Sequence, residues 1–116
     1  MSQGNQGTFE LDRGFAVRSE RSDADEHVRL SGEMDLSVVG WVDREMLRAE
    51  STDAARIVLD LDELEFLDAS GIRLLLHVAA RSQSNSGRLR IRRARSPQVV
   101  RVIELTGVAQ ALPFID

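Results

Sequence analysis

The sequence lacks several residue types that many functional sites require. Its 116 residues include no cysteine, which excludes disulfides, thiolate metal sites and cysteine nucleophiles. All fifteen basic residues are arginine, so a phosphate-binding P-loop and Schiff-base chemistry, which both need lysine, are excluded as well. Aromatic residues make up only 4% of the chain, and we therefore expect a core of leucine, valine, isoleucine and alanine.

The composition also argues against a membrane protein and against a nucleic-acid-binding protein. No apolar run approaches the ~20 residues that span a bilayer, and the polar start at 1–7 lacks the apolar stretch of a signal peptide. We expect that start to be a flexible tail, and the protein to be cytoplasmic and without a membrane contact. The net charge of −4 argues against direct nucleic-acid binding, which usually needs a basic surface. The length is typical of a single domain, which we expect at residues 8–116.

The apolar pattern predicts strands that alternate with helices. Alternating or continuous apolar residues predict strands at 9–11, 15–17, 28–31, 57–61 and 88–92, with a charged loop over 18–26. Apolar residues spaced three or four apart predict helices at 36–50, 70–83 and 97–106. With the hairpin at 9–17 counted as one unit, the order β-β-α-β-α-β-α predicts an α/β fold with a small mixed, largely parallel sheet and helices packed against it.

Local signals mark the ends of these helices. Ser37 is a candidate N-cap for the first helix. Ser96-Pro97 is typical of a helix start, and Gly107 is typical of a helix end. The apolar residues at 112–115 indicate a tail docked on the domain.

The most informative segment runs from Leu59 to Leu76, where a buried strand, an acidic turn and a helix beginning at Ser70-Gly71 are expected. A helix N-terminus presents unpaired N–H groups and partial positive charge, and can hold a phosphate, including one on a serine beside it. Ser70 is therefore either a helix cap or a phosphoacceptor.

Two further acids, Glu33 and Asp35, follow a predicted strand directly. If that strand neighbours the strand at 57–61, Asp35 lies near Asp68. Two carboxylates beside a hydroxyl could contact the Mg²⁺ of a partner kinase or act as general acid and base. The short chain shows no lid or substrate-positioning residues, so we expect no catalytic residues.

His27 and His77 are isolated, and no metal-ligand spacing is present, so neither a metal nor a cofactor is expected. The basic run from Arg88 to Arg95 favours a solvated sheet edge over a phosphate-backbone site, because aromatics for base stacking are missing nearby.

Three motifs together resemble a known family. Gly32-Glu33-Met34-Asp35-Leu36 is similar to the Gly-Glu-Leu-Asp segment of STAS domains, and the stretch from Leu59 to Gly71 is similar to their strand-turn-helix segment ending in Asp-Ser-Ser/Thr-Gly. Ser96-Pro97 through Leu105-Thr106-Gly107 resembles their last helix. The three occur in order and at fitting separations over nearly the whole chain, from Phe15 to Ile115.

The resemblance implies a role in bacterial transcription by partner switching. Stand-alone STAS domains of this length are mostly anti-sigma factor antagonists: the unmodified protein binds an anti-sigma factor, usually a serine kinase, and so frees a sigma factor. It is expected to be a monomer or weak homodimer. The partner-binding residues expected by this resemblance are Asp35, Leu36, Asp68, Ala69, Ser70, Gly71, Ile72 and Arg73.

One position departs from the family pattern. The kinase usually phosphorylates the first residue after the aspartate, which is Ala69 here, so only Ser70 remains as a phosphoacceptor candidate. Ser70 could substitute, the protein could be a permanently active antagonist, or it could belong to a branch that does not use phosphorylation. We slightly favour the alternatives in which phosphorylation at the usual position does not control the protein.

Other functions fit the same fold. A STAS domain can be a scaffold component of a stress-sensing complex or an accessory subunit of a lipid transporter. A phospho-receiver or small enzyme is less consistent with the chain, because receivers rely on a lysine that is missing here.

Overall fold

The structure, a computed structural model, describes residues 6–10 and 14–115 of the chain. The last residue of the strand predicted at 9–11, Leu11, lies outside these residues, as does most of the predicted tail. Strand β1 begins at Gln6. The elements are β1 (Gln6–Glu10), β2 (Ala16–Ser22), β3 (Asp25–Met34), α1 (Val39–Glu50), β4 (Arg56–Leu67), α2 (Ala69–Asn85), β5 (Leu89–Arg92), α3 (Pro97–Thr106), the short turn η1 (Ala109–Ala111) and β6 (Phe114–Ile115).

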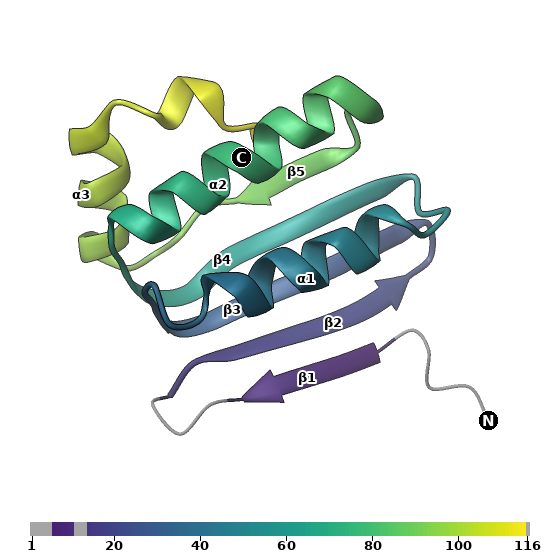
Figure 1. The fold of residues 1–116 in the computed structure, drawn as a ribbon, viewed down its shortest axis with the longest axis horizontal. Coiled ribbons are helices and arrows are strands. Elements are labelled where there is room, and N and C mark those ends of the chain that lie inside the picture. The colour runs from purple at the N-terminus through teal and green to yellow at the C-terminus, as the bar shows by residue number, and fades with distance from the viewer. Residues whose placement is uncertain (1–5, 11–13, 116) are drawn as a thin grey trace.

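The sheet has six strands in the order β1-β2-β3-β4-β5-β6. The first three pair antiparallel, and β3 to β6 pair parallel, which confirms the predicted mixed, largely parallel sheet. The parallel crossovers all advance in the same direction, and right-handed crossovers of this kind place their helices on one face. In Figure 1, α1 and α2 lie side by side in front of the sheet.

A single apolar cluster lies between the helices and the sheet. Alternate residues of β3, among them Val28 and Leu30, are buried and face α1. Val42 and Met46 of α1, four residues apart, are both fully buried against them. Side chains from α2 and α3 join the same cluster, so the predicted aliphatic core is confirmed. Complete burial of one such side chain contributes about 1.5–3 kcal/mol.

The prediction of a charged loop at 18–26 was wrong. The segment forms most of β2 and the start of β3, joined by a tight turn at which Asp23 adopts a φ of 54°. The inward positions Ser19 and Glu26 are buried but polar, and this concealed the strand pattern. Ser19 donates a 2.5 Å hydrogen bond to Glu45 of α1, and Arg48 of α1 pairs with Glu26 at 2.6 Å.

The prediction of an acidic turn after residue 61 was also wrong, because β4 continues to Leu67. The pairing of β4 with β3 contains two register shifts. Because of them, the later inward-facing residues of β4, Leu64 and Leu67, are three positions apart rather than two. The first helix begins at Val39 rather than Leu36, and its N-cap residue Val38 makes no side-chain cap. The tail at 112–115 docks as predicted, with Phe114 and Ile115 pairing on β5.

The arginine run at 88–95 does not form a sheet edge, because β5 has β4 on one side and β6 on the other. Leu89 and Ile91 are buried, as the alternation predicted. Arg88 donates hydrogen bonds to the carbonyl oxygens of Glu50, Thr52 and Ala54, where α1 leads into β4. The run therefore includes structural arginines, not only solvated ones.

The face of the sheet away from α1 and α2 holds one buried carboxylate, Asp60 of β4, which is 1% exposed. Its Oδ2 lies 2.9 Å from His27 Nε2 and 3.4 Å from Arg29 Nε, and its Oδ1 accepts the Asp62 N–H at 2.9 Å. Burial alone would raise the pKa of Asp60, but these hydrogen bonds and the nearby positive charges outweigh burial and lower it.

A carboxyl group with a lowered pKa in the folded state stabilises the fold above its ordinary pKa, and this stability is lost as pH falls through the folded value. We expect Asp60→Asn to lower the free energy of unfolding at pH 7 by about 1–3 kcal/mol, because hydrogen bonds to a buried charged carboxylate are lost. The difference from the unaltered chain should shrink below pH 3.8, the ordinary value for Asp60, in urea titrations over a pH series. Asp53→Asn, at an exposed ion pair, should change stability little at any pH. If the difference in free energy of unfolding between Asp60→Asn and the unaltered chain stayed constant down to pH 2, this role of the Asp60 carboxylate would be contradicted.

Candidate functional site

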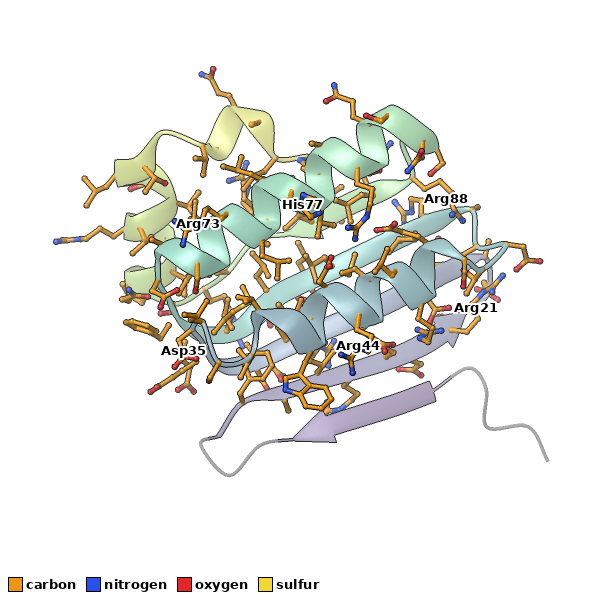
Figure 2. The ribbon with its side chains drawn as sticks, viewed as in Figure 1. Arg21, Asp35, Arg44, Arg73, His77 and Arg88 are labelled. Atoms are coloured by element: carbon orange, nitrogen blue, oxygen red, sulfur yellow. The ribbon has the colours of Figure 1, made fainter. Side chains whose placement is uncertain are left out.

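The candidate site lies where β3 and β4 end. These strands are parallel and neighbours, with Met34 opposite Leu67, so the residues that follow them, Asp35 and Asp68, lie beside each other. The Asp68 N–H donates to the Met34 carbonyl oxygen at 3.4 Å, which holds the two chain ends together. The predicted proximity of Asp35 and Asp68 is therefore confirmed. Figure 2 shows Asp35 and Arg73 at one end of the molecule, and Arg21 and Arg88 at the other.

Asp68, not Ser70, caps α2. Its Oδ1 accepts hydrogen bonds from the backbone N–H groups of Ser70 at 3.0 Å and Gly71 at 3.2 Å. The Ser70 hydroxyl also donates to the same oxygen, at 2.6 Å. Ser70 is only 9% exposed, so its hydroxyl is turned inward while Ala69 beside it is exposed. The cap interpretation of Ser70 was wrong, because an aspartate N-cap accepts these N–H groups two and three residues on.

Gly71 and Ile72 hold the start of α2 against the end of β4. A Cβ on Gly71 would overlap Cδ1 of Leu67 and lie 3.3 Å from Cε of Met34. Ile72 is 5% exposed and belongs to the core. Both residues therefore position the helix from inside and present no side chain to a partner.

The expected partner-binding residues thus divide into two groups. Ser70, Gly71 and Ile72 are buried. The others form a surface that we call the docking patch, which consists of Asp35, Leu36, Asp68, Ala69 and Arg73. Leu36, which is 72% exposed, is the large apolar side chain of the patch.

A groove between α1 and α2 continues from the docking patch, and sequence reasoning missed it. Its lining includes Leu36, Ser70 and Arg73 from the expected set, together with Val39, Gly40, Asp43, Leu74, Leu76 and His77. His77 lies one helical turn after Arg73 on α2 and is exposed, which agrees with its solvated interpretation. The i, i+4 spacing of Arg73 and His77 beside buried positions could have indicated this shared face.

The two carboxylates of the site are engaged in backbone structure. Asp35 Oδ1 accepts the Ser37 N–H at 2.9 Å and the Ser37 hydroxyl at 2.6 Å, so Ser37 is a donor to the turn before α1 and not the predicted cap. Asp68 caps α2 with the same kind of geometry. Within residues 6–10 and 14–115, no group of three or more His, Cys, Asp or Glu side chains is placed to hold a metal ion.

Comparison with known proteins identifies the family. A family model described as "Mlab, STAS domain" matches residues 17–115, from β2 to β6. The chain belongs to the STAS domain family. The anti-sigma F factor antagonist of Paenibacillus polymyxa is 30% identical over 90 residues, which cover 77% of this chain and 76% of that protein. The resemblance carried by the three sequence motifs is therefore confirmed.

Solved structures share the fold of this STAS domain. An anti-sigma factor antagonist from Mycobacterium paratuberculosis aligns with a TM-score of 0.76 and 23% identity, covering 91% of this chain and 89% of that one. The Bacillus cell fate determinant SpoIIAA, in its phosphorylated form, aligns with a TM-score of 0.62 and 22% identity, covering 86% and 91%. The predicted STAS-type α/β architecture is confirmed.

Gly71 offers a test of how α2 is seated. We expect Gly71→Ala to destabilise the STAS domain by about 1–3 kcal/mol, because the added methyl group forces Leu67 or the helix start to shift. Gly40→Ala provides the control, since a Cβ there meets no atom within 4 Å and alanine favours helix. Urea unfolding of both variants would measure the difference. Equal stability of Gly71→Ala and the unaltered chain would contradict the tight contact.

Proposed function

We propose that this STAS domain is an anti-sigma factor antagonist that regulates bacterial transcription by partner switching. The observation that carries the proposal is the docking patch, an exposed leucine and alanine among charged side chains where β3 and β4 end. The relative from Paenibacillus polymyxa is named as an anti-sigma F factor antagonist, and it supports the same role here. The partner would be an anti-sigma factor with serine kinase activity.

The composition of the docking patch suits a protein partner. Leu36 offers apolar area to bury, and Asp35, Asp68 and Arg73 surround it with charge. Interfaces typically place such an apolar anchor at the centre and polar groups at the rim. The groove between α1 and α2 extends the apolar area through Val39 and Leu76.

The protein would act by binding alone. The carboxylates that a reaction would need as acid and base are engaged in the Asp35 turn and the Asp68 cap. No helix among residues 6–10 and 14–115 is both long and apolar enough to cross a membrane. We propose that the protein meets its partner in the cytoplasm.

Phosphorylation would not release this antagonist from its partner. The exposed residue at the usual acceptor position is Ala69, which has no hydroxyl, and the Ser70 hydroxyl is turned into the Asp68 cap. A phosphate on Ser70 would bring about −1.5 to −2 charges against the Asp68 carboxylate in a nearly buried position. We therefore favour a permanently binding-competent antagonist among the three alternatives that the sequence left open.

Binding to the cognate anti-sigma factor tests the docking patch. We expect Leu36→Ala to weaken the affinity at least tenfold, or about 1.4 kcal/mol, because an exposed apolar anchor is lost. Leu105→Ala is the matched control, since Leu105 is 78% exposed on α3, and it should leave the affinity unchanged.

Isothermal titration calorimetry separates the outcomes. No binding by the unaltered chain would contradict the function, and equal losses in both variants would contradict the location of the patch. Recovery of the chain from its native cell with a large sensory assembly or a lipid-transport ATPase would favour the alternative STAS roles.

Phosphorylation by the same kinase tests the locked state. On incubation with the anti-sigma kinase and ATP, the intact mass of the unaltered chain should not change. Ala69→Ser, which restores the usual hydroxyl at an exposed position, should gain one phosphate and lose affinity for the kinase. A phosphate on the unaltered chain that disappears in Ser70→Ala would contradict the locked antagonist.

A further inference from the structure

Asp60 gathers basic side chains on the sheet face away from α1 and α2. The register places Arg29 of β3, Asp60 of β4 and Arg92 of β5 in one row across three parallel strands. Arg29 Nε and Arg92 Nε approach the same oxygen of Asp60, Oδ2, at 3.4 and 3.5 Å. His27 Nε2 lies 2.9 Å from that oxygen. One carboxylate therefore holds two guanidinium groups close enough for a single small ligand to reach both.

The terminal N–H donors of both arginines are available to such a ligand. A guanidinium group has five N–H donors, and Arg29 and Arg92 each turn Nε toward Asp60. In the part of the chain that the structure describes, their Nη atoms donate no hydrogen bond. The two side chains are 37% and 52% exposed, whereas that of Asp60 is 1% exposed. An incoming anion would therefore meet guanidinium N–H groups and not the carboxylate.

The charge around Asp60 is positive. Two permanently charged guanidinium groups share its carboxylate, and Arg90, two residues before Arg92 on the same face of β5, adds a third positive charge. Three arginines against one carboxylate leave an excess of two positive charges. Arg18 and Glu20, exposed on β2, add one charge of each sign beside this group. A phosphate monoester carries about −1.5 to −2 charges at pH 7, which matches the excess.

We propose that Arg29 and Arg92 form a binding site for a phosphate group, carried either by inorganic phosphate or by a small soluble phosphate ester. Arginine binds phosphate through paired N–H donors in a planar fork. Two such forks beside one carboxylate can bind different oxygens of the same phosphate. Asp60 is a positioning residue, since it holds both guanidinium groups through Nε and does not itself contact the ligand.

The surroundings of the site favour a small ligand over a long polyanion. Glu33 and Glu63 are exposed farther along β3 and β4 on the same face, where they would repel a long acidic chain. The row of Arg29, Asp60 and Arg92 contains no aromatic side chain on which nucleic-acid bases could stack. The excess positive charge is thus confined to a few neighbouring positions, as one phosphate group requires.

The phosphate site is separate from the proposed function. The docking patch lies at the strand ends and at the start of α2, whereas the phosphate site lies on the opposite face of the sheet. The site can be tested without any other protein, and its failure would leave the proposed anti-sigma factor binding unaffected.

Titration of the ¹⁵N-labelled chain with inorganic phosphate tests the site by NMR. At pH 7 and constant ionic strength, the side-chain Nε–H and backbone N–H signals of Arg29 and Arg92 should shift and saturate with a dissociation constant of about 1 mM. A titration with glycerol 3-phosphate distinguishes the two sources of the phosphate group. Tighter binding than inorganic phosphate would identify an ester as the ligand, and equal or weaker binding would identify free phosphate.

Substitutions separate a defined site from general charge attraction. Arg29→Gln and Arg92→Gln should each raise the dissociation constant for phosphate at least tenfold, because a charged fork is lost. Arg29→Lys keeps the charge but loses the fork, and should raise the constant by a smaller factor than Arg29→Gln. Arg101→Gln removes the same charge from an exposed position of α3 and should leave the constant unchanged. Circular dichroism melting curves check that all variants fold.

Several results would overturn the proposal. Shifts that stay linear up to about 20 mM phosphate would show that no site exists. Equal weakening by Arg101→Gln would show general charge attraction. Shifts confined to Ser70 and Arg73 would locate the phosphate at the start of α2 instead. Shifts caused by a tetraglutamate peptide, and not by phosphate, would show that the face binds an acidic protein segment.

Discussion

The parallel pairing of β3 with β4 determines where every part of the candidate site lies. It runs from Asp25 opposite Arg56 to Met34 opposite Leu67. Because both strands point the same way, the turns into α1 and α2 leave the sheet at the same edge. Asp35 and Asp68 are neighbours for this reason alone, although they are far apart in the sequence.

The start of α2 then sets which side chains of the site reach the surface. Asp68 binds the N–H groups of Ser70 and Gly71, and Gly71 fits against Leu67 only because it lacks a Cβ. These two contacts fix the rotation of the first helical turn. As a result Ala69 and Arg73 point outward, and the Ser70 hydroxyl turns back to the cap. If the first turn of α2 were rotated by one residue, Ser70 would be exposed and Ala69 buried, and a kinase could then reach the serine.

Much of this arrangement was predictable from local patterns. The strand at 57–61, the α2 helix and the helix between Pro97 and Gly107 have strong apolar periodicity, and the closeness of Asp35 and Asp68 follows from strand order. The β2–β3 hairpin was not predictable in this way, because its inward residues Ser19 and Glu26 are polar and are satisfied by α1. The extension of β4 was hidden by register shifts that break the alternation. The groove between α1 and α2 depends on how two helices pack, which no single segment reveals.

The central claim is that the docking patch, and not another surface of this STAS domain, contacts the anti-sigma factor. Backbone amide NMR spectra of the ¹⁵N-labelled chain, recorded while the unlabelled anti-sigma factor is added, test it most directly. We expect the largest shifts and line broadening to cluster at Leu36, Ala69 and Arg73 and along the groove to His77. Perturbations confined to α3 or to the sheet face around Asp60 would contradict it.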